Sequence, residues 1–228
     1  MQLQAITIGS ARLIRGDCRE VIPGLGLADA VLTDPPFFTP AVHYQARVEY
    51  QRTWADLSIL SHWWADIAAR LAGICGGTHC LVFCNADSFA AFYPAMFNHW
   101  RKTVALGWDK CHVGLGRIWR HQHELIIAAR GKNAYHPTDG ILRADVLRCK
   151  ATRPASRVHP VEKPADMLAA LIEAISPPGG IIVDPFMGSG TTREACALSG
   201  RRFIGVEFAP RYFDRACDRI SAAQATQG

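Results

Sequence analysis

The sequence lacks several patterns that would assign it to a membrane, secreted or repeat class. No apolar run reaches the roughly 18 to 20 residues that a membrane-spanning helix needs. The first residues lack the basic region and apolar core of a signal peptide, so we expect a soluble, cytoplasmic protein that binds no membrane. Repeats and low-complexity tracts are also missing. With 228 residues, 49% of them hydrophobic, the chain can bury a substantial core, and we interpret 1–228 as one domain.

The eight cysteines lack the spacing of a metal site. None belongs to a C-x-x-C pair, and the densest group is Cys75, Cys80 and Cys84. In a mid-sized chain without an export signal, reduced thiols are the favoured interpretation. His121-Gln122-His123 could place two imidazoles on one face of a strand, but this pattern is more typical of a polar face. We therefore expect no metal.

The positive charge is concentrated in one segment. Residues 101–158 hold twelve Lys and Arg against four Asp and Glu, a net charge of +8, so the rest of the chain carries −3 of the total +5. A basic zone on a mildly acidic body is typical of a protein that binds a polyanion. An uneven solvated surface is the alternative interpretation.

Apolar runs typical of buried strands alternate with helical patterns, which predicts an α/β fold. The predicted strands are Ala11–Arg15, Ala28–Thr33, His79–Cys84, Lys102–Leu106, Glu124–Ala129, Gly180–Val183 and Arg202–Glu207. Three late helices are predicted: one with Pro164 in its first turn, one over Thr191–Ser199 and one starting near Pro210. Residues 131–158 are predicted to be an irregular basic insertion, and residues 38–56 a long loop or short helix.

A glycine-rich turn follows one predicted strand and precedes a helix. Asp184 ends the strand and Gly188-Ser189-Gly190 follows, where glycines let the backbone approach a ligand closely. Glu207 ends the next strand, 23 residues after Asp184, near the offset at which an acid binds ribose hydroxyls. The third glycine of G-x-G-x-x-G is absent, and no G-x-x-x-x-G-K-[ST] loop is present. The pattern therefore favours a nucleoside ligand over a dinucleotide or a triphosphate.

Another strand leads into Thr33-Asp34-Pro35-Pro36-Phe37. The prolines stiffen this turn and remove two N–H donors, so it presents the Asp34 carboxylate and the Pro35 carbonyl as acceptors. Two acceptors can each take one N–H of an exocyclic amine and expose its lone pair, while Phe37 stacks on the base. A proline-stiffened turn with a capping aspartate is the structural alternative.

With both motifs in view, the chain resembles the N6-adenine and N4-cytosine amino-methyltransferases of DNA. The catalytic motif precedes the cofactor motif, the order called the beta class. The resemblance covers nearly the whole chain, and the matching segments are Arg15–Cys18, Thr33–Phe37, Trp108–Lys110, His123-Glu124, His159–Pro164, Asp184–Thr192 and Gly205–Glu207. Phe37 stands where the family more often has Tyr.

The resemblance implies a Rossmann-like methyltransferase fold with a mostly parallel sheet and helices on both faces. It also implies S-adenosylmethionine as methyl donor and a flipped base, in DNA that we expect to be double-stranded, as acceptor. The implied catalytic residues are Asp34, Pro35, Pro36 and Phe37. The implied cofactor residues are Asp17, Cys18, Asp34, His159, Lys163, Asp184, Phe186, Gly188, Ser189, Gly190, Thr191 and Glu207. The implied DNA contacts, within the basic insertion, are Arg143, Arg148, Lys150, Arg153 and Arg157.

Several functions remain open at this point. Asp before Pro-Pro favours adenine N6, whereas Ser there is commoner for cytosine N4. An RNA methyltransferase and a non-catalytic DNA-binding module are further alternatives, although a mere binding module would not need Asp34, Gly188 and Glu207 together. Protein-glutamine methyltransferases usually carry Asn-Pro-Pro-Tyr after the cofactor motif, and this chain has neither feature. The sequence leaves open the target sequence, a homodimer and a role in restriction-modification.

Overall fold

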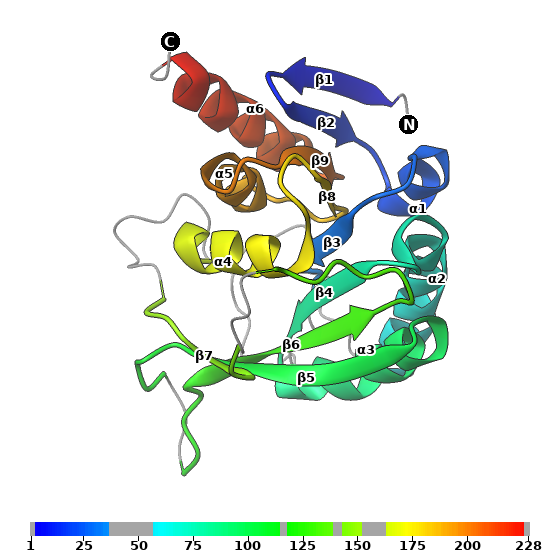
Figure 1. Ribbon diagram of the computed structural model, residues 1–228, viewed down its shortest axis with the longest axis vertical. Helices are drawn as coiled ribbons and strands as arrows, with labels where there is room; N and C mark the ends of the chain where they lie inside the picture. The colour runs from blue at the N-terminus through cyan, green and yellow to red at the C-terminus, as the bar shows by residue number, and fades with distance from the viewer. Residues whose placement is uncertain (1–2, 37–56, 115–117, 139–142, 152–162, 226–228) are drawn as a thin grey trace.

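The computed structural model describes residues 3–36, 57–114, 118–138, 143–151 and 163–225, and the strands found there form one nine-stranded sheet (Figure 1). Its order is β1-β2-β9-β8-β3-β4-β6-β5-β7. The strands are β1 Gln4–Ile8, β2 Ala11–Arg15, β3 Ala30–Thr33, β4 His79–Cys84, β5 Lys102–Asp109, β6 His123–Arg130, β7 Val146–Arg148, β8 Ile181–Asp184 and β9 Arg202–Glu207. The helices are α1 Cys18–Val21, the 3-10 turn η1 Ile22–Gly24, α2 Leu57–Cys75, α3 Ala86–His99, α4 Ala165–Ile175, α5 Thr191–Leu198 and α6 Pro210–Ala225.

The sheet is mostly parallel. Strands β2, β9, β8, β3 and β4 lie side by side and run in the same direction. Strand β1 is antiparallel to β2, and β6 is antiparallel to both β4 and β5. The carboxyl ends of the parallel strands and of β5 therefore share one edge with the amino end of β6. This arrangement confirms the predicted fold class.

Helices cover both faces of the sheet, as its alternating side chains require. Val31 of β3 packs into a core with α2 and α3, around the fully buried Trp64. The next residue, Leu32, packs on the opposite face into a core with α4, α5 and α6, where Phe213 is fully buried. Figure 1 shows α4, α5 and α6 on one side of the sheet and α1, α2 and α3 on the other.

Most predicted elements lie close to their observed bounds, and β2, β4 and β9 match them. Strands β1 and β7 are unpredicted, because both are short edge strands with largely exposed side chains and so have weak apolar patterns. Strand β7 lies within the predicted irregular insertion, which is a correction. Pro164 is the N-cap of α4 and not a residue of its first turn. The predicted loop over 38–56 lies outside the described residues.

Gly205 of β9 sits where no side chain fits. A Cβ added there would lie 2.4 Å from the Met187 sulfur and 2.6 Å from Cε1 of Phe203. We predict that Gly205→Ala lowers the free energy of unfolding by about 1–3 kcal/mol through overpacking, measured by urea denaturation. The matched control is Gly73→Ala in α2, where an added Cβ meets no described atom within 4 Å. That variant should gain about 0.5–1 kcal/mol; equal effects in the two variants would contradict the packing argument.

Candidate active site

Acidic side chains gather at the edge where the parallel strands end. Asp17 follows β2, Asp34 follows β3, Asp184 ends β8 and Glu207 ends β9. Glu124 lies near the amino end of β6, which reaches the same edge because β6 runs antiparallel. Ligands of α/β proteins bind at this edge of the sheet. The candidate site therefore extends along it.

Asp184 connects the two motifs that the sequence singles out. Its Oδ1 accepts hydrogen bonds from Thr33 Oγ1 at 2.7 Å and from the Phe186 N–H at 3.0 Å, and its Oδ2 accepts one from Thr192 Oγ1 at 2.6 Å. Burial raises the pKa of Asp184 to about 6, while the two hydroxyls act in the opposite direction. The carboxyl group thus ties the end of β3 to β8 and to the first turn of α5.

Glu207 holds the glycine-rich turn from the neighbouring strand. Its Oε2 accepts a hydrogen bond from the Gly188 N–H at 3.1 Å and its Oε1 one from the Ala209 N–H at 2.7 Å. Burial raises the pKa of Glu207 to about 7, against the effect of these donors. Gly188 has φ +53°, and a Cβ added there would meet no described atom within 4 Å. The turn therefore leaves open space beside a buried acid that still has acceptor capacity.

The rest of this turn leads directly into α5. Ser189 is buried, and Gly190 adopts φ +86° as the N-cap of the helix that Thr191 begins. Phe186 lies half-buried before the turn, with its ring centroid 5.6 Å from that of Trp63 in α2. The backbone N–H groups at the start of α5 are thereby presented at the site edge.

Asp17 and Cys18 lie farther along the same edge of the sheet, beyond Glu207. Asp17 is the N-cap of α1, and its hydrogen bonds from Arg19 lower its pKa. The Cys18 thiol points into the core, where burial raises its pKa to about 12. A ligand near this segment could reach the backbone of Cys18 but not its thiol.

Asp34 of the predicted catalytic motif is paired with a lysine from far along the chain. Lys163, just before α4, makes an ion pair with Asp34 Oδ2 and a second one with Glu124 Oε2 at 3.3 Å. The Lys163 side chain is only 6% exposed. Burial raises the pKa of Asp34, and the charge of Lys163 opposes this shift. The other oxygen, Asp34 Oδ1, is shielded from solvent and has no hydrogen-bond partner among the described residues.

Sequence reasoning assigned no role to Glu124 or Lys110. Lys110 Nζ lies 2.6 Å from Glu124 Oε1, so Glu124 stands between two lysines. Both residues belong to segments that resemble the family's middle strands, but resemblance alone did not show that they lie beside the Asp34–Lys163 pair. The sequence feature that could have indicated a role was Glu124 itself, an acid directly before the apolar run of β6.

The remaining predicted site residues lie beside Asp34, on the surface, or outside the described residues. Pro35 is buried and Pro36 is half-buried beside Asp34. Arg143, Arg148 and Lys150 are exposed, and Arg148 Nε lies 3.5 Å from Asp109 Oδ2 at the end of β5. The predicted site residues Phe37, Arg153, Arg157 and His159 lie outside the described residues.

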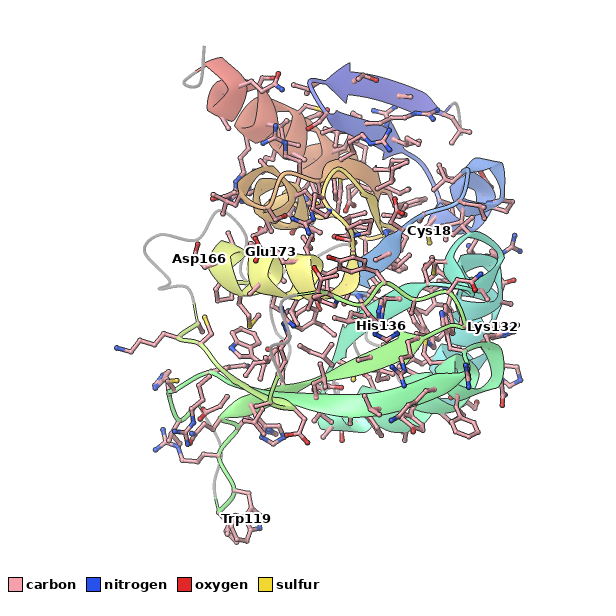
Figure 2. The ribbon with its side chains drawn as sticks, in the orientation of Figure 1. Cys18, Trp119, Lys132, His136, Asp166 and Glu173 are labelled. Atoms are coloured by element: carbon pink, nitrogen blue, oxygen red, sulfur yellow. The ribbon has the colours of Figure 1, made fainter. Side chains whose placement is uncertain are left out.

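The connection between β5 and β6 leaves the sheet at the same edge. Ile118 and Trp119, both in this connection, are 86% and 88% exposed. Figure 2 shows Trp119 far from the body of the sheet.

Within the described ranges, no group of three or more His, Cys, Asp or Glu side chains could hold a metal ion. None of the helices described has the length and apolarity that crossing a bilayer requires.

Comparison with known families and proteins gives consistent matches. Residues 28–218 match the sequence model of a family described as DNA methylase, of the N6 and N4 type. The chain is 31% identical over 221 residues to "Putative methylase YubD" of Escherichia coli K12, covering 94% of this chain and 92% of that protein. A shorter match, 43% identical over 65 residues, joins 28% of this chain to 22% of the DNA adenine methyltransferase YhdJ of the same organism.

Two solved structures share the fold at low sequence identity. The complex of M1.HpyAVI with S-adenosylmethionine matches with a TM-score of 0.68 at 22% identity, covering 92% of this chain and 98% of that one. The cytosine-N4-specific PvuII DNA methyltransferase matches with a TM-score of 0.71 at 14% identity, covering 93% and 87%. At these identities the likeness shows the fold.

The hydroxyl donors of Asp184 provide a test of the connection between the motifs. We predict that Thr192→Val lowers the free energy of unfolding by about 1–3 kcal/mol, because a buried carboxylate loses a donor. The loss should be larger at pH 8 than at pH 5, since Asp184 is ionised above a pKa of about 6. Urea denaturation at both pH values measures it, with Thr7→Val on the exposed face of β1 as control. Equal losses at the two pH values would contradict the prediction.

Proposed function

The chain belongs to the N6/N4 DNA methylase family, and on that premise we propose that it transfers a methyl group from S-adenosylmethionine to N6 of adenine in DNA. The target base would have to leave the helix stack, because an amine paired inside a duplex cannot reach a donor held in the protein. We also propose that residues 1–228 act as one domain.

The observation that carries the proposal is the unequal treatment of the two Asp34 oxygens. Oδ2 is held by Lys163, whereas Oδ1 is shielded from solvent without a partner among the described residues. A buried acceptor without a donor is unfavourable by itself. An N–H of an exocyclic amine would satisfy it, and the stiff Pro35-Pro36 backbone offers the Pro35 carbonyl as a second acceptor for the other N–H. Accepting both bonds would direct the amine's lone pair out of the base plane.

The glycine-rich turn fits a nucleoside-type cofactor. Glu207 retains lone pairs that ribose hydroxyls could use, and the space beside Gly188 would admit a ligand close to the backbone. Phe186, Ser189, Gly190 and Thr191 are the further residues that we propose to contact the cofactor here. When bound, S-adenosylmethionine supplies an electrophilic methyl group on a sulfonium. Asp184 and Lys163 are already bonded to protein partners, which favours a supporting role for both. We propose that Asp17 and the backbone of Cys18 contact the cofactor.

Adenine is favoured over cytosine by two observations. The motif begins with Asp34, and the local match to a DNA adenine methyltransferase reaches 43% identity. Cytosine N4 is the second candidate, because the fold also matches a cytosine-N4-specific enzyme with a TM-score of 0.71. Both reactions need the same acceptors for an exocyclic amine.

We predict that Asp34→Asn lowers methyl transfer by at least about 100-fold while leaving S-adenosylmethionine affinity nearly unchanged. The amide cannot accept a proton and presents an N–H where an acceptor is needed. Transfer of labelled methyl groups to duplex DNA, followed by nucleoside analysis, measures both the rate and the modified base. Asp66→Asn on the exposed face of α2 is the control. More than a tenth of wild-type activity in Asp34→Asn would refute the role, and N4-methylcytosine as sole product would assign the reaction to cytosine.

We further propose that the exposed cations Arg143, Arg148 and Lys150 contact DNA phosphates, with Arg153 and Arg157 from the same segment. Each lost phosphate contact should reduce the slope of log affinity against log salt by about one unit for duplex DNA. We therefore predict that Arg148→Ala and Lys150→Ala weaken DNA binding and flatten this slope, measured by fluorescence anisotropy. Arg12→Ala on β2, at the other end of the sheet, should leave it unchanged. Identical slopes in all variants would exclude these contacts.

A further inference from the structure

Four charged side chains form a row of alternating sign at the catalytic end of the site. Asp34 pairs with Lys163, Lys163 with Glu124 at 3.3 Å, and Glu124 with Lys110 at 2.6 Å. They come from four separate places in the chain: the end of β3, the residue before the N-cap of α4, the start of β6 and the residue after β5. The row is electrically neutral, and all four side chains are at most 26% exposed.

Aromatic rings support both lysines in this row. Lys163 Nζ lies 5.1 Å from the ring centroid of Phe83 in β4, and Lys110 Nζ lies 5.6 Å from that of Trp108 in β5. Trp108 is also the register partner of Glu124 across β5 and β6. Ring faces attract cations, and at this separation they limit where each ammonium group can lie. Both ammonium groups therefore lie close to aromatic rings that strands of the sheet carry.

Glu124, the second carboxylate beside Lys163, helps to keep this buried lysine charged. Burial would lower the pKa of Lys163, but Asp34 and Glu124 together raise it above its ordinary value. Burial would likewise raise the pKa of Glu124, but Lys163 and Lys110 bring it below its ordinary value. A lone Asp–Lys pair removed from water can relax by moving its proton, which abolishes both charges. Glu124 opposes that relaxation because it also needs the charge on Lys163.

We propose that Glu124 and Lys110 are positioning residues for methyl transfer, which hold the charged Lys163 against Asp34 Oδ2 so that Oδ1 stays directed at the target amine. This inference rests on the proposed function and extends it to two residues that do not touch the substrate. Lys110 balances the charge of Glu124, so that the row adds no net charge beside the reacting base. Removing the charge of Glu124 or of Lys110 should change the pKa of Asp34, because both charges act on that carboxyl group.

The sign of each change follows from the charges around Asp34. The described ionisable groups that face it are Lys163, Glu124, Lys110, Asp184 on β8 and the Cys84 thiol on β4. Burial raises the pKa of Cys84 to about 12, so this thiol is neutral at ordinary pH. Removing the negative charge of Glu124 lowers the pKa of Asp34, whereas removing the positive charge of Lys110 raises it. The two substitutions should therefore act in opposite directions.

The experiment is the pH dependence of kcat at saturating S-adenosylmethionine and DNA. Activity that needs ionised Asp34 is lost as the pH falls through its pKa. We expect Glu124→Gln to move this acid limb to lower pH and Lys110→Gln to move it to higher pH, with Lys110→Arg near wild type and the double variant in between. Misplacement of Asp34 should lower kcat of Glu124→Gln by about 10- to 100-fold, with S-adenosylmethionine affinity unchanged.

Controls separate a positioning role from a structural one. Glu173→Gln makes the same chemical change at an exposed site on α4, which Figure 2 labels, and should leave the profile unchanged. If Glu124→Gln does not fold, Lys110→Gln still tests the direction of the shift, because its acid limb should move to higher pH whereas that of Lys110→Arg should stay near wild type. Acid limbs that coincide with wild type, or shift in the same direction in both Gln variants, would overturn the inference. Absence of methyl transfer in the wild type would instead refute the proposed function.

Discussion

A carboxylate removed from water has to find donors within the protein, and Asp184 finds them in both of the segments that form the site. Thr33 ends the strand that leads to the catalytic turn, and Thr192 belongs to the helix that follows the glycine-rich turn. Because both hydroxyls bind one carboxyl group, the two turns cannot move independently. In the proposed site, this connection would set the distance between the methyl donor and the target amine.

The acidic groups along the site edge are compensated by four kinds of donor. Asp17 uses an arginine, Asp34 and Glu124 use lysines, Asp184 uses hydroxyls and Glu207 uses backbone N–H groups. Lysine compensation keeps a charge close to the reacting atoms, whereas N–H compensation leaves lone pairs for neutral hydroxyls. A single edge of a DNA methylase sheet can thereby offer one region suited to a ribose and another suited to an amine.

The apolar runs predicted most of the sheet, since central strands are buried on both faces and their composition shows it. Edge strands β1 and β7 were not predicted, because each is held by pairing with one neighbouring strand and not by burial. The motifs predicted that Asp34, Asp184 and Glu207 follow or end strands, and the structure places all three at one edge of the sheet. The motifs could not reveal the link from Lys163 to Glu124, because contacts between residues from separate elements depend on strand order, and β6 reaches this edge only by running antiparallel. The sequence also could not distinguish a Cys18 that faces the ligand from one that faces the core.

The strand order has a consequence for how the protein is made. The first strands pair with the last: β2 lies beside β9, and β3 lies beside β8, about 150 residues further along the chain. Contacts of such long sequence separation form late, and a ribosome releases the carboxyl-terminal strands last. A nascent chain that already displays Asp34 therefore still lacks Asp184, Thr192 and Glu207. On the proposed assignment, an incomplete translation product would carry the turn for the target amine without an assembled place for the methyl donor, and so would be inactive on DNA.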